Sequence, residues 1–95
     1  MTYELEIKDE ARKEIIEAYL YYEKEQQELG ERFLKHLDDS FQRIIKNPSQ
    51  FPQRRPPYRE AFVQIFPFLI IFEIDGSDII VYSVFHTRQD PKKKP

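Results

Sequence analysis

The N-terminal part of the chain changes from a strand-like to a helix-like hydrophobic pattern. Residues 3–8 alternate apolar and charged side chains, which is the period of a strand with one buried face. Beyond Asp9, apolar residues recur every three or four positions, as on one face of an α-helix. That face comprises Ala11, Ile15, Ala18 and Tyr22, and is widened by Ile16, Tyr19 and Leu20. We expect a strand followed by a helix, with the Asp9 side chain capping the helix N-terminus.

A second helix is predicted from about Glu31 to Lys46. Its apolar stripe consists of Phe33, Leu34, Leu37, Phe41, Ile44 and Ile45. Gly30 is expected to end the first helix, because glycine commonly follows a helix C-terminus. Asn47-Pro48 is expected to end the second, because proline disfavours a helical conformation in the residue before it. The two helices would form a helical hairpin.

The second half of the chain is predicted to be extended. Residues 47–58 hold four prolines and indicate a loop. Three strands follow, over Arg59–Phe66, Phe68–Asp75 and Ile79–His86, with a turn at Gly76-Ser77 between the last two. The predicted class is α+β, in the order β-α-α-β-β-β. The last three strands would be antiparallel, and both helices would cover one face of a four-stranded sheet.

Length and composition narrow the class of protein. The chain has 95 residues, which is the size of a single domain, and 15% of them are aromatic, which argues against intrinsic disorder. It has no cysteine, so disulfides and thiolate metal sites are excluded. Neither a signal-peptide pattern nor an apolar run of membrane-spanning length is visible, and a cytoplasmic protein without a membrane partner is expected. The polar, basic segment 87–95 is expected to be a flexible tail.

The formal net charge of −2 argues against a chain that works mainly on nucleic acid. Basic residues nevertheless outnumber acidic ones in the second half of the chain, so any such contact would need a local patch there. Glu14 with Glu17, and Asp38 with Asp39, are carboxylate pairs on the predicted helices. They lack a histidine at ligand spacing, so they are interpreted as solvated faces. No metal site and no cofactor is expected.

Both faces of the last two predicted strands are apolar. Phe68, Ile70, Phe72 and Ile74 alternate with Leu69 and Ile71, while Ile80, Tyr82 and Val84 oppose Ile79, Val81 and Phe85. Since two helices cover only one face, the other would present an apolar, aromatic surface of the kind that protein partners cover. The residues expected to contact a partner are Phe68, Phe72 and Tyr82, together with Lys92 and Lys93 of the tail. Alternatively, the loop 47–58 and the tail fold over this face.

An ordered set of short motifs follows this layout. They are Ala18–Glu23, Leu29–Leu34, Ile44 to Asn47-Pro48, Phe51-Pro52, Arg59, Phe66-Pro67-Phe68 with Ile70, and Val84–Thr87 with Asp90-Pro91. Together they resemble the RelE/ParE toxin superfamily of bacterial type II toxin–antitoxin modules, on the side often called plasmid stabilisation proteins. The resemblance covers about residues 3–92. It implies a compact α+β toxin that inhibits growth and is held inactive by a cognate antitoxin protein.

The superfamily contains two mechanisms. RelE-like members cut messenger RNA on the ribosome, which requires a base, an acid and cations around the phosphate. In that case Arg59, Arg88 and His86 would be catalytic, with His86 as the acid or base and Arg59 as a phosphate clamp. Arg54 and Arg55 in the preceding loop would bind RNA phosphates. Each also has an ordinary structural explanation, such as an ion pair for Arg59 or a strand-end hydrogen bond for His86.

Several departures argue against RNA cleavage. The RNA-cleaving relatives usually have lysines near the second strand and a C-terminal aromatic residue. This chain has no lysine between Lys46 and Lys92, and no tyrosine after Tyr82. Gln89 takes the position of the usual tail arginine. We therefore favour a ParE-like toxin that is not an enzyme and inhibits a protein target such as DNA gyrase. A RelE-like endoribonuclease acting on ribosome-bound mRNA, or a degenerate non-toxic binding module, remain the alternatives.

Overall fold

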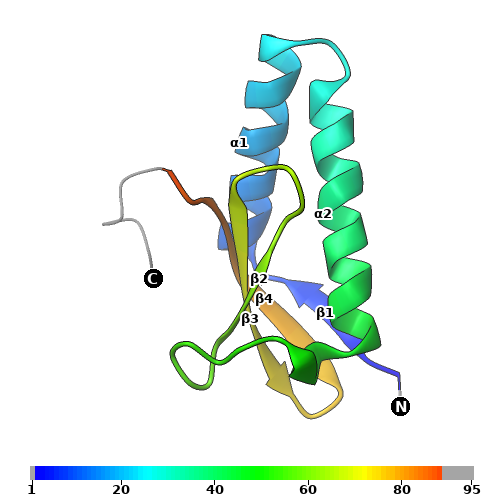
Figure 1. Ribbon diagram of the computed structural model, residues 1–95, viewed down its shortest axis with the longest axis vertical. Helices are drawn as coiled ribbons and strands as arrows, with labels where there is room; N and C mark the ends of the chain where they lie inside the picture. The colour runs from blue at the N-terminus through cyan, green and yellow to red at the C-terminus, as the bar shows by residue number, and fades with distance from the viewer. Residues whose placement is uncertain (1, 89–95) are drawn as a thin grey trace.

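The computed structural model describes residues 2–88, and they follow the predicted order of a strand, two helices and three strands (Figure 1). The elements are β1 (Glu4–Ile7), α1 (Asp9–Glu25), α2 (Leu29–Lys46), a short 3-10 helix η1 (Pro48–Gln50), β2 (Arg59–Phe62), β3 (Phe68–Asp75) and β4 (Asp78–His86). The α+β class predicted from the sequence is confirmed. The predicted tail contacts Lys92 and Lys93 lie outside the described residues.

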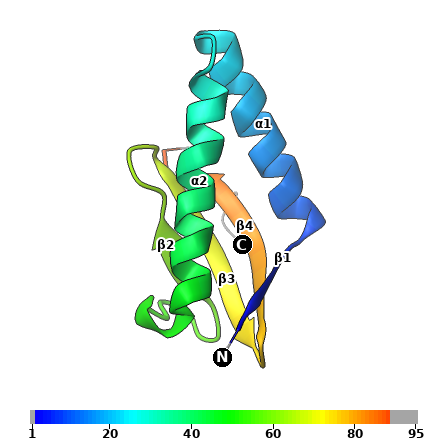
Figure 2. The ribbon, with the colours of Figure 1, turned by 90° about the vertical axis from the view of Figure 1, so that its right-hand side faces the viewer.

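The four strands form one mixed sheet in the order β1-β4-β3-β2. β2 is antiparallel to β3, and β3 to β4, as predicted, while β1 lies parallel to β4 at one edge. The helical hairpin connects β1 to the rest of the chain and lies over one face of the sheet, which Figure 2 shows with the helices in front and the sheet behind. Within residues 2–88, no helix lies over the opposite face.

The start of α1 differs from the prediction. Lys8 occupies the N-cap position, and no side chain caps the helix there. Asp9 is instead the first helical residue, where its carboxylate lies near the positive end of the helix dipole.

Gly30 does not end a helix. α1 ends at Glu25, and Gly30 is the second residue of α2. A Cβ atom on Gly30 would lie 2.7 Å from the carbonyl oxygen of Tyr19 and 2.6 Å from Cγ of Glu23. The Glu23 carboxylate accepts hydrogen bonds from the backbone N–H groups of Gly30 (2.8 Å) and Glu31 (3.2 Å). Glycine is therefore needed because the two helices approach closely here, and Glu23 satisfies the free N–H groups at the start of α2.

The strands also differ from the prediction in detail. β2 ends at Phe62 rather than Phe66, and β4 begins one residue early, at Asp78. β4 contains a bulge, because Ile71 lies opposite Ser83 whereas Phe72 lies opposite Val81. Tyr82 is thus an extra residue that interrupts the alternation of side chains between the two faces.

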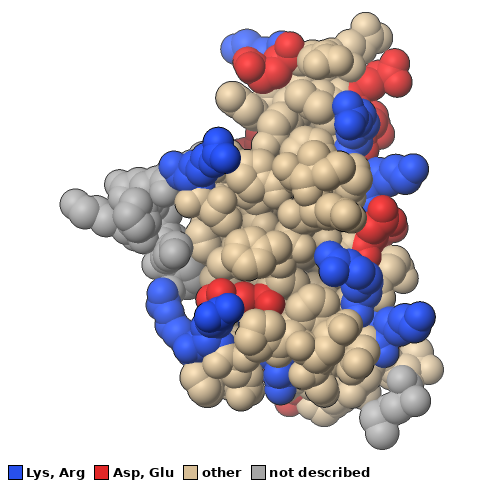
Figure 3. Space-filling model, in the orientation of Figure 1, with Lys and Arg blue, Asp and Glu red and all other residues tan. Residues whose placement is uncertain are grey.

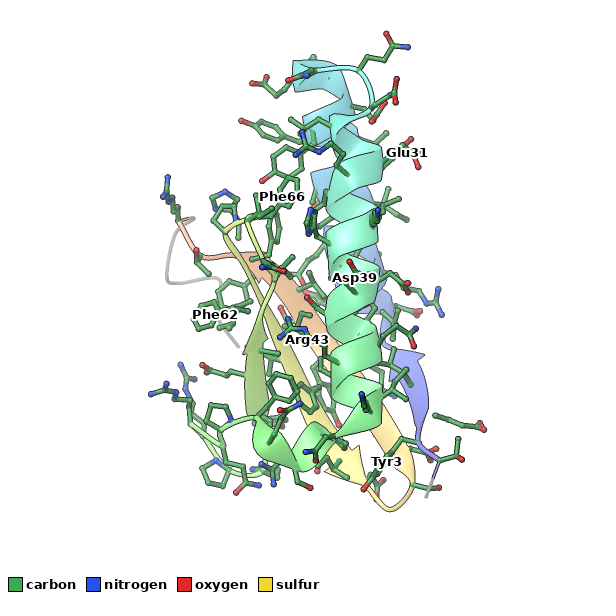
Figure 4. The ribbon with its side chains drawn as sticks, turned by 45° about the vertical axis from the view of Figure 1, so that its right-hand side comes forward. Tyr3, Glu31, Asp39, Arg43, Phe62 and Phe66 are labelled. Carbon is green, nitrogen blue, oxygen red and sulfur yellow. The ribbon has the colours of Figure 1, made fainter. Side chains whose placement is uncertain are left out.

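A cluster of four aromatic rings joins the helices to the sheet. Phe33 of α2 lies 4.9 Å from Phe68 and 5.5 Å from Phe66, measured between ring centroids. Tyr22 of α1 lies 5.1 Å from Phe66 and 5.5 Å from Phe33. Figure 4 shows Phe66 on the side of the helices. Both helices and the hairpin between β2 and β3 thus share one packed contact.

This packing corrects part of the predicted partner surface. Phe68 and Phe72 are 5% and 0% exposed and belong to the core between sheet and helices. They cannot meet a partner while the fold is intact. The alternation along β3 was predicted correctly, but the face assigned to the partner was wrong for these two residues. The alternation along β4 was wrong after Tyr82, because the bulge places Val84 in the core and Phe85 on the helix-free face.

We predict that Gly30→Ala lowers the free energy of unfolding by about 1–3 kcal/mol, because the added methyl group would overlap the Tyr19 carbonyl. Chemical denaturation followed by circular dichroism would measure this. Asp39→Ala, at an exposed position of α2 (Figure 4), is the matched control and should change stability by less than about 0.5 kcal/mol. Equal stability of Gly30→Ala and the native chain would contradict the close helix contact.

Candidate functional site

The helix-free face of the sheet carries an apolar groove of about 460 Å³. Its lining residues are Arg55, Pro56, Tyr58, Glu60, Phe62, Leu69, Ile71, Tyr82, Phe85 and Thr87. The strand register explains their meeting, because Leu69 of β3 lies between Phe62 of β2 and Phe85 of β4. Cross-strand partners share one face of a sheet, so all three side chains point away from the helices. Figure 4 shows Phe62 on the side away from α2.

Aromatic side chains form the walls of the groove. Phe62 is 63% exposed and Tyr58 is 40% exposed, so both offer apolar surface to a partner. The Tyr58 ring meets the Tyr82 ring edge to face, with centroids 5.4 Å apart. The Tyr82 hydroxyl donates a 2.9 Å hydrogen bond to Oε1 of Glu73. That bond, and to a lesser extent burial, raises the pKa of Tyr82, so its phenol stays protonated at neutral pH.

Basic residues flank the groove. Arg54 and Arg55 belong to the loop before β2, and Arg55 lines the groove. In Figure 3, basic side chains stand at the lower left, where this loop projects, next to a broad uncharged surface. At the other end, the exposed Arg88 follows Thr87, which also lines the groove. The rim of the groove, formed by Arg54, Arg55 and Arg88, is thus more basic than the chain as a whole.

Arg59, the predicted phosphate clamp, holds the preceding loop. Its Nη1 donates hydrogen bonds to the backbone carbonyl oxygens of Phe51 (2.6 Å) and Ser49 (3.3 Å). These bonds attach the segment after α2 to the sheet edge. These observed contacts are structural, but they are made with backbone carbonyls rather than with the carboxylate that the ordinary explanation invoked.

His86 lies at the end of β4, with its ring centroid 5.1 Å from that of Phe68. Its Nδ1 accepts a 3.0 Å hydrogen bond from the backbone N–H of Arg88. Burial, and next the positive charge of Arg88, lower the pKa of His86, so the ring is neutral at pH 7. A neutral imidazole with one nitrogen occupied in this way is a poor general acid.

The candidate nuclease residues do not converge. Arg59 pairs with Phe72 and His86 pairs with Phe68, so their partners are four residues apart along β3. At about 3.3 Å per residue this is a separation of ~13 Å along the strand. Arg59 and His86 also lie on strands at opposite sides of β3. One phosphate could not contact both side chains in this conformation.

Glu14 has a role that the hydrophobic pattern did not indicate. Its Oε1 accepts hydrogen bonds of 2.9 Å from Ser83 Oγ and from the backbone N–H of Val84. β1 pairs with β4 only as far as Val81, so Glu14 satisfies an N–H on the edge that β1 leaves open. Burial raises the pKa of Glu14, and outweighs the two hydrogen bonds, which lower it. Only the side-chain contact across the fold identifies this residue.

Within residues 2–88, no group of three or more histidine, aspartate or glutamate side chains is placed to hold a metal ion. No helix in that range is both long and apolar enough to cross a membrane.

An α+β domain with an apolar groove on its helix-free face has the features of a small protein-binding domain. Residues 5–91 match the family model described as the ParE toxin of the type II toxin–antitoxin system parDE, and the chain therefore belongs to this toxin family. This confirms the resemblance found in the sequence motifs.

A solved structure supports the same fold. The chain is similar to one described as the chromosomal ParDE TA system from P. aeruginosa, with a TM-score of 0.80. The similarity covers 92% of this chain and 98% of the other, at 15% sequence identity. At that identity the similarity establishes a common fold. A search of curated protein sequences finds no match.

We predict that Glu14→Gln makes the chain more stable at pH 7. The amide oxygen of glutamine can still accept both hydrogen bonds. The substitution removes a carboxylate whose charged form is disfavoured by burial. Because the pKa of Glu14 is higher in the folded than in the unfolded state, ionisation of Glu14 lowers the free energy of unfolding of the native chain as the pH rises. The advantage of the variant should therefore disappear below about pH 4.

Thermal unfolding of both proteins between pH 4 and pH 7 measures this difference. Glu17→Gln, on an exposed position of the same helix, is the control and should not show the same trend. A Glu14→Gln variant that is less stable than the native chain at pH 7 would show that the charge itself holds α1 to β4.

Proposed function

We propose that this toxin acts by binding and inhibiting a protein target, in the manner of ParE toxins that inhibit DNA gyrase, and is neutralised by a cognate antitoxin in the sheet groove. The observation that carries the proposal is the apolar groove between Tyr58 and Phe85 on the helix-free face. A surface of this kind on a small domain needs a partner to cover it.

The groove favours a helical segment as its occupant. Its floor is made of side chains from β2, β3 and β4; β3 is paired on both sides, and β2 is paired with it along one edge. A partner segment lying on the face of these strands cannot add to the hydrogen-bond ladder. It must satisfy its own backbone groups, which an amphipathic helix does internally.

The charges around the groove indicate the sequence of that helix. Arg54 and Arg55 stand at one end and Arg88 at the other, against a single acidic lining residue, Glu60. Acidic residues flanking an apolar stripe would complement this rim and speed association. We therefore expect an antitoxin segment with apolar residues at helical spacing between carboxylates.

Inhibition by binding suits the structure better than RNA cleavage does. Arg59 is engaged with two backbone carbonyls, and His86 is neutral and distant from it along the sheet. A cleavage site would have to bring an acid, a base and cations around one phosphate. Binding to a protein target requires only a complementary surface.

Growth of a bacterial culture after induction of this chain alone tests the proposal. Growth should stop and recover when the neighbouring open reading frame is co-expressed as the antitoxin. Filamentous cells with DNA damage would support gyrase as the target. Toxicity that collapses protein synthesis and is abolished by combined Arg59→Ala and His86→Ala substitution would instead support RNA cleavage. Uninhibited growth with abundant folded protein would contradict an active toxin in that host.

We predict that Ile71→Glu escapes the antitoxin. Ile71 is half-buried in the groove, so a carboxylate there would meet the apolar stripe of the bound helix. The affinity for the antitoxin, measured by calorimetry, should fall about 30-fold or more. Ile16→Glu, at an exposed apolar position of α1, is the matched control and should leave this affinity unchanged. Unaltered binding by Ile71→Glu would place the antitoxin elsewhere.

A further inference from the structure

Ile65, in the connection between β2 and β3, has an unfavourable backbone conformation. Its φ is 75°, in the left-handed region that L-residues with branched side chains rarely adopt. The same side chain is 71% exposed, the highest value among the large hydrophobic residues exposed on the described chain. Backbone strain and apolar exposure therefore coincide at one residue.

The residues on either side hold this conformation in place. The backbone N–H of Val63 donates to the carbonyl of Phe68 (3.0 Å) and closes the connection. Phe66 is 8% exposed and packs between Tyr22 and Phe33. Phe66 thus points towards the helices and Ile65 points outwards, while the positive φ of Ile65 lies within the connection that Val63 and Phe68 close.

Pro67 is held by hydrogen bonds from Thr87, which follows β4. Its carbonyl oxygen accepts hydrogen bonds from the backbone N–H (2.8 Å) and from Oγ1 (3.2 Å) of Thr87. The proline ring restricts its own φ and the conformation of Phe66. The tip of the hairpin is thus attached both to the helices and to the end of β4, and Ile65 is presented on a rigid support.

Isoleucine at this position does not serve the stability of the fold. The β3–β4 turn has a similar φ of 64° but uses a glycine, Gly76, for which that conformation is unstrained. An isoleucine that is mostly exposed gains little from burial to offset its strain. Strain of this kind persists where the surrounding structure imposes it, and it is concentrated at functional sites.

We propose that Ile65 is a contact residue for the protein target of the toxin, and that its side chain enters an apolar pocket on that target. This inference rests on the proposed function. A rigidly presented apolar side chain loses little conformational freedom on binding, which favours its use as an anchor. Phe62, at the end of the strand leading to this tip, is 63% exposed and extends the apolar surface.

The target and the antitoxin would use different residues. Ile65 is absent from the lining of the sheet groove, whereas Phe62 belongs to it. An antitoxin helix in the groove would cover Phe62 and hinder the approach of the target to the tip, without requiring contact with Ile65. Neutralisation would then arise from overlap between the two surfaces at Phe62.

Ile65→Asn tests the proposal, because asparagine tolerates the left-handed conformation and removes the apolar side chain. We expect the melting temperature to rise by about 4–8 °C as the strain is relieved. We also expect induction of the variant to stop growth no longer, while its affinity for the antitoxin stays within about twofold of the native value. Greater stability with lost toxicity cannot result from misfolding.

Two controls separate the contributions of strain and contact. Ile65→Val keeps a branched apolar side chain in the same conformation and should remain toxic. Ile16→Asn removes an apolar side chain that is 57% exposed on α1 and should also remain toxic.

The outcomes distinguish this inference from the proposed function. Full toxicity of Ile65→Asn beside a toxic native chain would overturn the inference alone. Loss of antitoxin affinity with retained toxicity would also overturn it, and would assign Ile65 to the antitoxin. An Ile65→Asn variant whose melting temperature does not rise would contradict the backbone strain at Ile65 on which the inference depends. A native chain that leaves growth unaffected would overturn the proposed function and this inference with it.

Discussion

The packing of aromatic rings between the helices and the sheet is the contact on which the rest of the structure depends. Phe33 and Tyr22 come from the two helices, and Phe66 and Phe68 come from the hairpin between β2 and β3. With Phe68 turned towards the helices, strand alternation directs Leu69 and Ile71 to the other face. The same cluster thus determines both the core and the position of the groove. It also holds Phe66 inwards, beside the exposed Ile65.

The bulge at Tyr82 adapts β4 to this arrangement. Ile79 and Val81 face the core before it, and Val84 faces the core after it. If Tyr82 took a regular place in the alternation, Phe85 would fall on the core side and could not pair with Leu69 on the helix-free face. The bulge therefore places Tyr82 and Phe85 together on the helix-free face, and completes the groove.

Periodicity predicted most of the fold, including the span of β3 and the order of all elements, because alternation and helical spacing directly reflect which side chains are buried. It could not tell which face of β3 meets the helices, since Phe68, Ile70 and Phe72 are as apolar as Leu69 and Ile71. Only the packing against Phe33 decides this. Gly30 was misinterpreted because a close approach between helices leaves no local signal that distinguishes it from a helix end.

The kind of residue that lines the candidate site was predictable from the sequence, but the individual residues were not. An uncovered apolar sheet face followed from having two helices for four strands, and Tyr82 was correctly expected on it. Phe62 and Phe85 were not predicted to lie on this face. Phe62 is the last residue of β2, which ends earlier than predicted, and Phe85 follows the bulge in β4. Glu14 had the pattern of a solvated carboxylate, and its bonds to β4 depend on where β1 stops pairing.

An antitoxin that covers the helix-free face of the sheet should change the environment of the groove side chains and leave the outer face of α1 unaffected. Methyl NMR of the isoleucine and leucine side chains, recorded with and without the antitoxin, tests this expectation most directly. We expect the largest shifts at Ile71 and Leu69 in the groove, and little change at Ile16 and Leu20 on the outer face of α1. Large shifts confined to Ile16 and Leu20 would contradict it, and would make the helical hairpin the antitoxin site.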